Sequence, residues 1–172
     1  MDESDAFSHA LLGQVYLLIR KYEKAIASGK RSVELQPNSA LFHMHLGSTL
    51  SYAGRVDEAI AHIKQAFRLN PFPAYYNYLD LGRCYLQKGQ YEDALAEYKK
   101  ALQREPNNFF AHLNLAATYN MMGLEKEAQA EASEVLRLNP KFSLDYLAKV
   151  SGYKDRTEIE KIITALRKAG LK

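Results

Sequence analysis

Histidine is the residue type in this sequence best suited to bind a metal or transfer protons, and five histidines occur: His9, His43, His45, His62 and His112. Imidazole titrates close to neutral pH and is a common metal ligand. A metal site needs several ligands that converge on one point. His43 and His45 are two residues apart, which on a helix places them on different sides, and the other histidines are widely separated. We therefore predict no metal site.

Other candidate chemistry is equally weak. Ser151 and Lys154 have the Ser-x-x-Lys spacing of penicillin-recognising enzymes, but they lie between two predicted helices and lack the partner motifs that such an enzyme needs. Cys84 is the single cysteine, which excludes an internal disulfide and a multi-cysteine zinc site. The sequence also lacks a phosphate-binding loop and a His-Glu-x-x-His motif. We predict no catalytic residue, no cofactor and no enzyme activity.

The elements that carry these side chains are marked by four prolines, Pro37, Pro71, Pro106 and Pro140, which are 34, 35 and 34 residues apart. Each proline follows one amphipathic segment and precedes another. Because proline cannot continue a helix, it marks the end of each segment. Alignment on the prolines gives repeats at 6–39, 40–73, 75–108 and 109–142, with Ala74 as a one-residue insertion.

Equivalent places in the repeats hold similar residues. The first halves share a Leu followed by a small residue, and the second halves share an alanine. Gly54, Gly89 and Gly123 mark the turn between the halves, where the first repeat has Arg20 instead. The shared residues are Leu12-Gly13, Leu46-Gly47, Leu81-Gly82 and Leu115-Ala116, with Ala25, Ala59, Ala94 and Ala128.

These residues resemble the tetratricopeptide-repeat (TPR) family, whose 34-residue unit is two antiparallel helices with small residues where they approach most closely. The resemblance implies an all-α fold, a right-handed α-solenoid of four TPR helix pairs in residues 1–142. It also places His9, His43 and His112 at a packing position of the repeat. We therefore interpret these histidines as packing residues.

Residues 143–172 depart from the repeat and predict a short helix over 143–150, a turn, and a helix over 155–169. Ile159, Ile162, Ile163 and Leu166 form an apolar stripe, so we expect a C-terminal capping helix pair that covers the last repeat. The segments 142–144, 153–155 and 166–171 also resemble the tail of TPR regions in bacterial class III adenylate or guanylate cyclases. This resemblance implies an alternative function as a regulatory or oligomerising module of a larger cyclase or transcriptional regulator.

The family resemblance further implies a concave groove lined by the first helix of each repeat, with residues that share one helical stripe. An apolar and aromatic start and a mildly polar middle favour an apolar or amphipathic peptide, although packing between repeats could instead bury part of the stripe. The Lys, Asn and Arg cluster that grips acidic chaperone tails in some members is absent, so we predict no carboxylate clamp. The predicted groove residues are Phe7, Ala10, Gln14, Leu41, Met44, His45, Ser48, Tyr52, Tyr76, Leu79, Asp80, Arg83, Phe110, Leu113, Asn114, Ala117 and Met121.

The first predicted helix is apolar on all sides, with ten apolar residues among the fourteen of 6–19. An outermost repeat normally turns a polar face to solvent. We therefore expect either a homodimer edge formed by Leu11, Val15 and Leu18, or contact with an upstream domain of a longer native chain.

Composition limits the classes of partner that the chain is expected to bind. Charged residues make up 25% of the chain with a net charge of only +3 and no basic tract, so we expect no nucleic acid as a partner. No apolar run reaches the roughly 18 residues of a membrane span, and the acidic start does not resemble a secretory signal. We expect a cytoplasmic protein that binds a protein or peptide.

Overall fold

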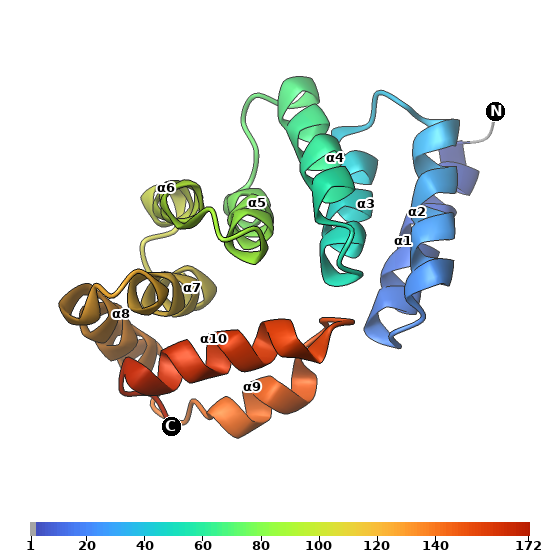
Figure 1. Ribbon diagram of the computed structural model, residues 1–172. Coiled ribbons are helices and arrows are strands. Elements are labelled where there is room, and N and C mark those ends of the chain that lie inside the picture. The colour runs from blue at the N-terminus through green and yellow to red at the C-terminus, as the bar shows by residue number, and fades with distance from the viewer. Residues whose placement is uncertain (1–2) are drawn as a thin grey trace. The chain divides into compact units, whose positions relative to one another are not determined.

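The computed structural model describes residues 3–172, a range that contains ten α-helices and no strand (Figure 1). Residues 1–2 of the predicted repeat region lie outside this description. The first eight helices form four pairs whose members pack against each other. These pairs are α1 (Glu3–Leu18) with α2 (Tyr22–Leu35), α3 (Ala40–Tyr52) with α4 (Val56–Leu69), α5 (Tyr75–Gln87) with α6 (Tyr91–Arg104), and α7 (Phe109–Met121) with α8 (Glu125–Leu138). The predicted all-α, helical-repeat solenoid class is confirmed.

The chain forms two compact units. The N-terminal unit contains the first two helix pairs, up to Pro73, together with the short segment Gly152–Lys154. The C-terminal unit contains Ala74–Ser151 and Asp155–Lys172. The last two helices share a compact unit with the third and fourth pairs, and the division of the chain at residue 142 into repeats and cap stays a prediction. Pro71 and Pro73 keep the link between α4 and α5 out of helical conformation.

The last two helices are α9 (Leu144–Val150) and α10 (Arg156–Lys168). The Asp155 side chain accepts a hydrogen bond from the Thr157 N–H and so caps α10. The apolar stripe of α10 that contains Ile159 and Leu166 is buried, and α10 packs against both α7 and α9. None of the helices in the described range is long and apolar enough to cross a bilayer.

A small residue of the first helix makes the close approach within a pair. A Cβ atom at Gly47 would lie 2.7 Å from Ile63 Cγ1, and one at Gly82 would overlap the fully buried ring of Tyr98. Such contacts are possible only when the first helix lacks a side chain at that point. Helix pairing therefore depends on these positions.

The turn between the two helices has the same conformation in all four pairs. Gly54, Gly89 and Gly123 have φ between 70° and 82°, and Arg20 in the first pair has φ 58°. In each pair the next residue's N–H bonds to the carbonyl five residues earlier, as in Lys21 N–H to Tyr16 O at 2.8 Å. Arg20 therefore takes the left-handed conformation that glycine adopts in the other pairs, at a cost on the order of 1 kcal/mol.

Candidate peptide-binding surface

The predicted groove residues differ strongly in exposure. Phe7 and Leu41 in the N-terminal unit, and Tyr76 and Phe110 in the C-terminal unit, have 43% to 58% of their surface exposed. We call these four residues the rim row. Three of them lie in the first turn of α3, α5 and α7. The rim row is therefore available for contact with a partner.

One turn further along each helix, the predicted stripe is buried. Ala10, Met44, Leu79 and Leu113 have at most 9% of their surface exposed, and Ala117 is fully buried. These side chains belong to the cores of their units, as the packing interpretation of the stripe allowed. They pack beneath the rim row, but they are not exposed to a partner themselves.

The middle of the predicted surface is polar and engaged in internal contacts. In the N-terminal unit Gln14 Nε2 donates to the carbonyl of His45 at 3.4 Å, and Ser48 is half-buried nearby in sequence. In the C-terminal unit Arg83 Nη2 donates to Asp80 Oδ1 at 2.5 Å, and both side chains are more than four-fifths buried. This pairing cancels the two charges, so the middle of α5 offers no free cation for a carboxylate.

Aromatic neighbours hold the rim residues of α5 and α7. The ring of Tyr76 meets that of Tyr75 edge-on with centroids 5.6 Å apart, and Phe110 meets Phe109 in the same way at 5.3 Å. The Phe109 ring also contacts Phe142, at 5.6 Å. Edge-to-face contacts of this kind are favourable and restrict ring motion. The exposed rings are therefore anchored before any partner arrives.

The remaining predicted residues lie elsewhere on their units. Asn114 and Met121 are half-buried on α7. Tyr52, at the end of α3, meets the ring of Tyr153 edge-on at 5.4 Å, and its carbonyl accepts a hydrogen bond from Lys154 N–H at 2.9 Å. Tyr52 is thus occupied by the chain's own segment Gly152–Lys154, a contact between residues about 100 positions apart that helical periodicity cannot show.

Comparison with known proteins agrees with this repeat geometry. Profiles described as tetratricopeptide repeat match residues 8–39 and 50–97, and one described as TPR repeat matches residues 82–123. Together they span more than half of the 172 residues. The chain belongs to the tetratricopeptide-repeat family. Its similarity to TPR proteins supports a role as a protein–protein interaction scaffold.

Individual TPR proteins show the extent of the likeness. The small glutamine-rich tetratricopeptide repeat-containing protein 2 of Mycosarcoma maydis is 27% identical over 73% of this chain, which spans only 35% of that protein. The crystal structure of PilW, a type IV pilus biogenesis factor, matches 98% of this chain and 76% of its own with a TM-score of 0.78 and 21% identity. YrrB, described as a TPR protein with an unusual peptide-binding site, matches 98% of this chain and 86% of its own with a TM-score of 0.66 and 20% identity.

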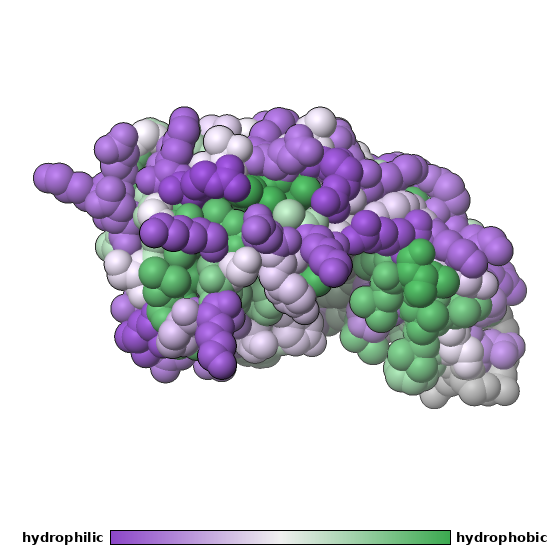
Figure 2. All heavy atoms as spheres, turned by 90° about the horizontal axis from the view of Figure 1, so that it is seen from below, coloured by the Kyte–Doolittle hydropathy of each residue, from purple (hydrophilic) through white to green (hydrophobic). Residues whose placement is uncertain are grey.

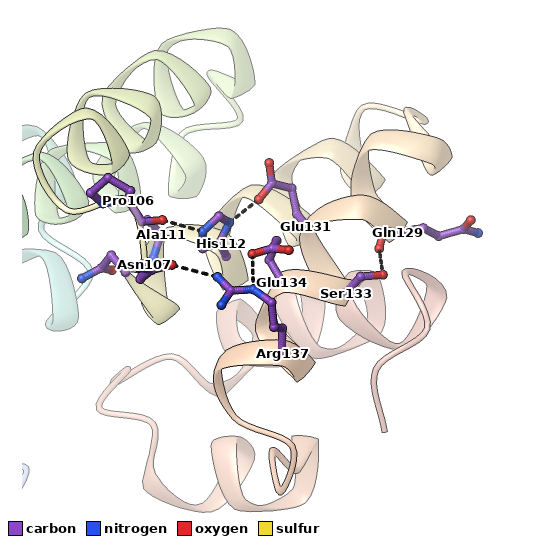
Figure 3. A network of polar contacts seen from close by, with 10 residues as sticks. Pro106, Asn107, Ala111, His112, Gln129, Glu131, Ser133, Glu134 and Arg137 are labelled. Atoms are coloured by element: carbon purple, nitrogen blue, oxygen red, sulfur yellow. Dashed lines mark hydrogen bonds and ion pairs between the residues drawn. The ribbon is translucent and has the colours of Figure 1, made fainter.

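Two of the histidines connect the helices of their TPR repeats. His112 lies within hydrogen-bonding distance of Glu131 Oε2 on α8, at 2.6 Å, and of the Pro106 carbonyl, at 3.1 Å (Figure 3). His43 makes the equivalent contacts with His62 Nδ1 and the Pro37 carbonyl, both at 2.9 Å. Both imidazoles are buried. Among the residues that the structure describes, no group of three or more His, Cys, Asp or Glu could hold a metal.

Sequence reasoning missed one open cavity in the C-terminal unit. It has a volume of about 550 Å³ and lies between one side of α10, the start of α6 and the end of α7. Met121 is the only predicted groove residue in its lining, which also includes Tyr91, Asn120, Glu160, Lys161 and Lys168. Its lining carries charges of both signs beside apolar surface. The sequence showed only that one side of this helix is charged, because the repeat pattern does not fix where α10 lies.

Proposed function

We propose that this TPR scaffold binds an apolar or amphipathic peptide along the first helices of its repeats, with the rim row as anchoring contacts: Phe7 and Leu41 in the N-terminal unit, Tyr76 and Phe110 in the C-terminal unit. The observation that carries the proposal is the exposure of a large apolar side chain at the same place in all four repeats. Single exposed hydrophobic residues are normal on protein surfaces. These four residues are not randomly distributed, because they recur at one position of the repeat. The description of YrrB as peptide-binding supports the same use of a TPR surface.

The chemistry of the surface favours an apolar peptide face over an acidic tail. Full burial of one large apolar side chain contributes about 1.5–3 kcal/mol, so completing the burial of half-exposed rings contributes about half of that for each. The Arg83–Asp80 pair leaves no net charge in the middle of α5. Binding should therefore depend little on salt concentration. The proposal includes no catalysis, no cofactor and no nucleic acid, and it places the protein in the cytoplasm.

The test uses a displayed library of random 16-residue peptides selected on the immobilised full chain. We expect enrichment of peptides with aromatic or leucine residues at helical or alternate spacing. The double change Tyr76→Ala and Phe110→Ala should weaken the selected peptides at least tenfold in calorimetric titration, because two anchors are lost. Phe72→Ala is the matched control, since Phe72 is 80% exposed but lies in the link after α4.

Two outcomes would count against this function. Selection of acidic C-terminal tails that bind in a strongly salt-dependent manner would contradict the predicted absence of a carboxylate clamp. Equal loss of affinity in the Phe72→Ala control would show that binding does not depend on the rim row. Circular dichroism of each variant checks that helix content is unchanged.

A second candidate function is a regulatory or oligomerising module of a larger nucleotide cyclase or transcriptional regulator. It is supported by the exposed apolar residues of α1, among them Leu18 at 82% exposed. The chain also spans 35% or less of the first three curated relatives that it matches. Sequencing of the coding region upstream of Met1 tests this function, because an in-frame catalytic or DNA-binding domain would support it and an adjacent translation start would oppose it.

A further inference from the structure

Helix α1 has two apolar faces of different kinds. One is made of small residues, including Ala6, Ala10 and Gly13, and it is buried within the N-terminal unit. The other carries large hydrophobic side chains, each at least 40% exposed, which the helical period of 3.6 residues places within one arc. We call this second face the α1 apolar face; its residues are Phe7, Leu11, Leu12, Val15 and Leu18 of α1 and Ile19, which directly follows the helix. Phe7 also belongs to the rim row, so a partner on this face would cover that one residue of the row.

The repeat register shows that the middle of the α1 apolar face, at Val15, has the character of an interior surface. Thr49 and Thr118 occupy the place of Val15 in the second and fourth repeats, and they are 1% and 0% exposed, whereas Val15 is 51% exposed. In those repeats the first helix packs against the preceding pair, since α3 contacts α1 and α2, and α7 contacts α5 and α6. The first repeat thus presents stacking residues to solvent.

The extent of this face is at the upper end of what a monomer usually exposes. Six large side chains at this exposure amount to a few hundred Å², about the upper range for a contiguous apolar patch on a monomeric protein. Figure 2 shows hydrophobic residues gathered in one area toward the N-terminal end of the chain. A surface of this kind marks an interaction site or an aggregation liability.

We propose that the α1 apolar face binds the same face of a second copy of this chain, in a two-fold dimer with the two α1 helices antiparallel. The face carries no charged residue, so it is complementary to itself, as a two-fold interface requires. The solvent-exposed side of α10 carries Glu160, Lys161, Arg167 and Lys168. Stacking α1 of one copy on that side of α10 in another would remove these charges from water, and the α1 apolar face offers no charged residue to pair with them, which is unfavourable.

Charges at the two ends of the face select the antiparallel orientation. Asp5 is exposed near the start of α1, and Lys21 is exposed just after its end. In an antiparallel pair Asp5 of one copy faces the end that carries Lys21 in the other, and the two helix dipoles oppose each other favourably. A parallel pair would bring like charges together.

Sedimentation equilibrium of the full chain from micromolar to millimolar concentration tests the proposal. We expect a reversible dimer, with its dissociation constant raised at least 100-fold by Leu11→Lys or by Val15→Lys. Phe72→Lys is the control, since it adds the same charge at an exposed apolar position away from α1. Because both replaced residues are about half exposed in the single chain, monomer helix content should be unchanged.

A charge exchange tests the orientation. Asp5→Lys alone should weaken the dimer severalfold, and Asp5→Lys with Lys21→Asp should restore it. A strictly monomeric chain would overturn the proposal and indicate that the face contacts a different segment or partner. A dimer unaffected by Leu11→Lys and Val15→Lys would overturn it as well. The Tyr76→Ala and Phe110→Ala variant should dimerise normally. Loss of dimerisation can therefore be distinguished from loss of peptide binding.

Discussion

The histidines show that the same repeat position can pair with different side chains, a second histidine in one repeat and a carboxylate in another. The Pro37 carbonyl can only accept, so the His43 Nε2 bears the proton of that contact. In neutral His43 the Nδ1 atom then accepts from the Nδ1–H of His62. At the equivalent place His112 faces the carboxylate of Glu131, which accepts hydrogen bonds and cannot repel a protonated imidazole. The His43–His62 pair is therefore the one that excess protons disrupt.

Stability should fall in weak acid because of His62. Burial lowers the pKa of His62 below its ordinary value of 6.5, the charges of His43 and Lys30 lower it further, and Glu58 opposes them. A folded state that binds this proton less tightly than the unfolded state keeps its full stability above pH 6.5 and loses stability as the pH falls below that value. We expect the melting temperature to drop by a few degrees between pH 7.5 and 5.5, measured by circular dichroism.

The fourth repeat provides the matched variant for this experiment. His62→Glu reproduces the His112–Glu131 pair at the second repeat, and it should abolish the acid-induced loss that His62 causes. Wild type and His62→Glu with the same dependence of melting temperature on pH over this range would show that the histidine pair is not responsible.

Sequence reasoning identified the packing role of His43 and His112, whereas His9 is only half-buried. It did not identify the partners of these side chains. The repeat register placed His43 and His112 at a packing position, and both side chains are buried. Their partners lie nineteen residues later, on the second helix of each pair. Side-chain rotamers and the approach of two helices decide such a contact, and neither can be derived from residue spacing.

The helix pairs are held by a small residue that faces a side chain of variable size. Gly47 faces Ile63 and Gly82 faces Tyr98, while Ala116 and Ala132 occupy the equivalent places in the fourth pair. In the second and third pairs a glycine on the first helix leaves room for a large side chain on the second, whereas Gly13 faces Gly29 in the first pair. The two positions form one unit of packing.

Gly82→Ala should destabilise the protein. The added methyl group would overlap the buried Tyr98 ring, and overpacking of this kind costs typically about 1–3 kcal/mol. This cost exceeds or offsets the gain of about 1 kcal/mol that alanine has over glycine in a helix interior. Urea denaturation followed by circular dichroism measures the change in unfolding free energy.

A double-mutant cycle separates packing from backbone effects. With Tyr98→Ala in place the ring is gone, so Gly82→Ala should then stabilise by about 1 kcal/mol through helix propensity alone. The same destabilisation by Gly82→Ala in both backgrounds would show that the two residues do not interact.

The groove shows where sequence patterns stop being informative for a helix. The spacing of Tyr76, Leu79 and Arg83 correctly places them on one helix, but the structure exposes the first, buries the second and pairs the third internally. Periodicity identifies a stripe on a helix. Which part of the stripe stays exposed depends on the neighbouring helices, and their positions are a property of tertiary packing.

For the whole molecule, the most important feature is the segment between α9 and α10, because residues far apart in the sequence meet there. Gly152–Lys154 belongs to the N-terminal unit, although the helices before and after it belong to the C-terminal unit. Tyr22 donates its hydroxyl to the Gly152 carbonyl at 3.0 Å, and Lys154 Nζ pairs with Glu23 at 2.9 Å. The predicted turn between the last two helices is therefore also a structural part of the N-terminal unit.

Tyr153→Ala should destabilise the N-terminal unit despite its distance in sequence. Tyr153 is buried and packs on Tyr52, and truncation of a buried aromatic residue costs about 3–5 kcal/mol. Hydrogen exchange should become faster at the end of α3 and the start of α2. Tyr146→Ala is the control because Tyr146 is 67% exposed. Unchanged exchange at Tyr52 and its neighbours in Tyr153→Ala would contradict this role.

The late position of Gly152–Lys154 has a consequence during synthesis on the ribosome. The two helix pairs of the N-terminal unit are complete once Pro73 has been made, but their last segment follows about 80 residues later. At a translation rate of ~5–20 residues per second, the interval is roughly 4–16 s. Throughout that time the segment that later contacts Tyr22, Glu23 and Tyr52 has not yet been made. A chaperone that recognises aromatic side chains could therefore bind the nascent unit during this interval.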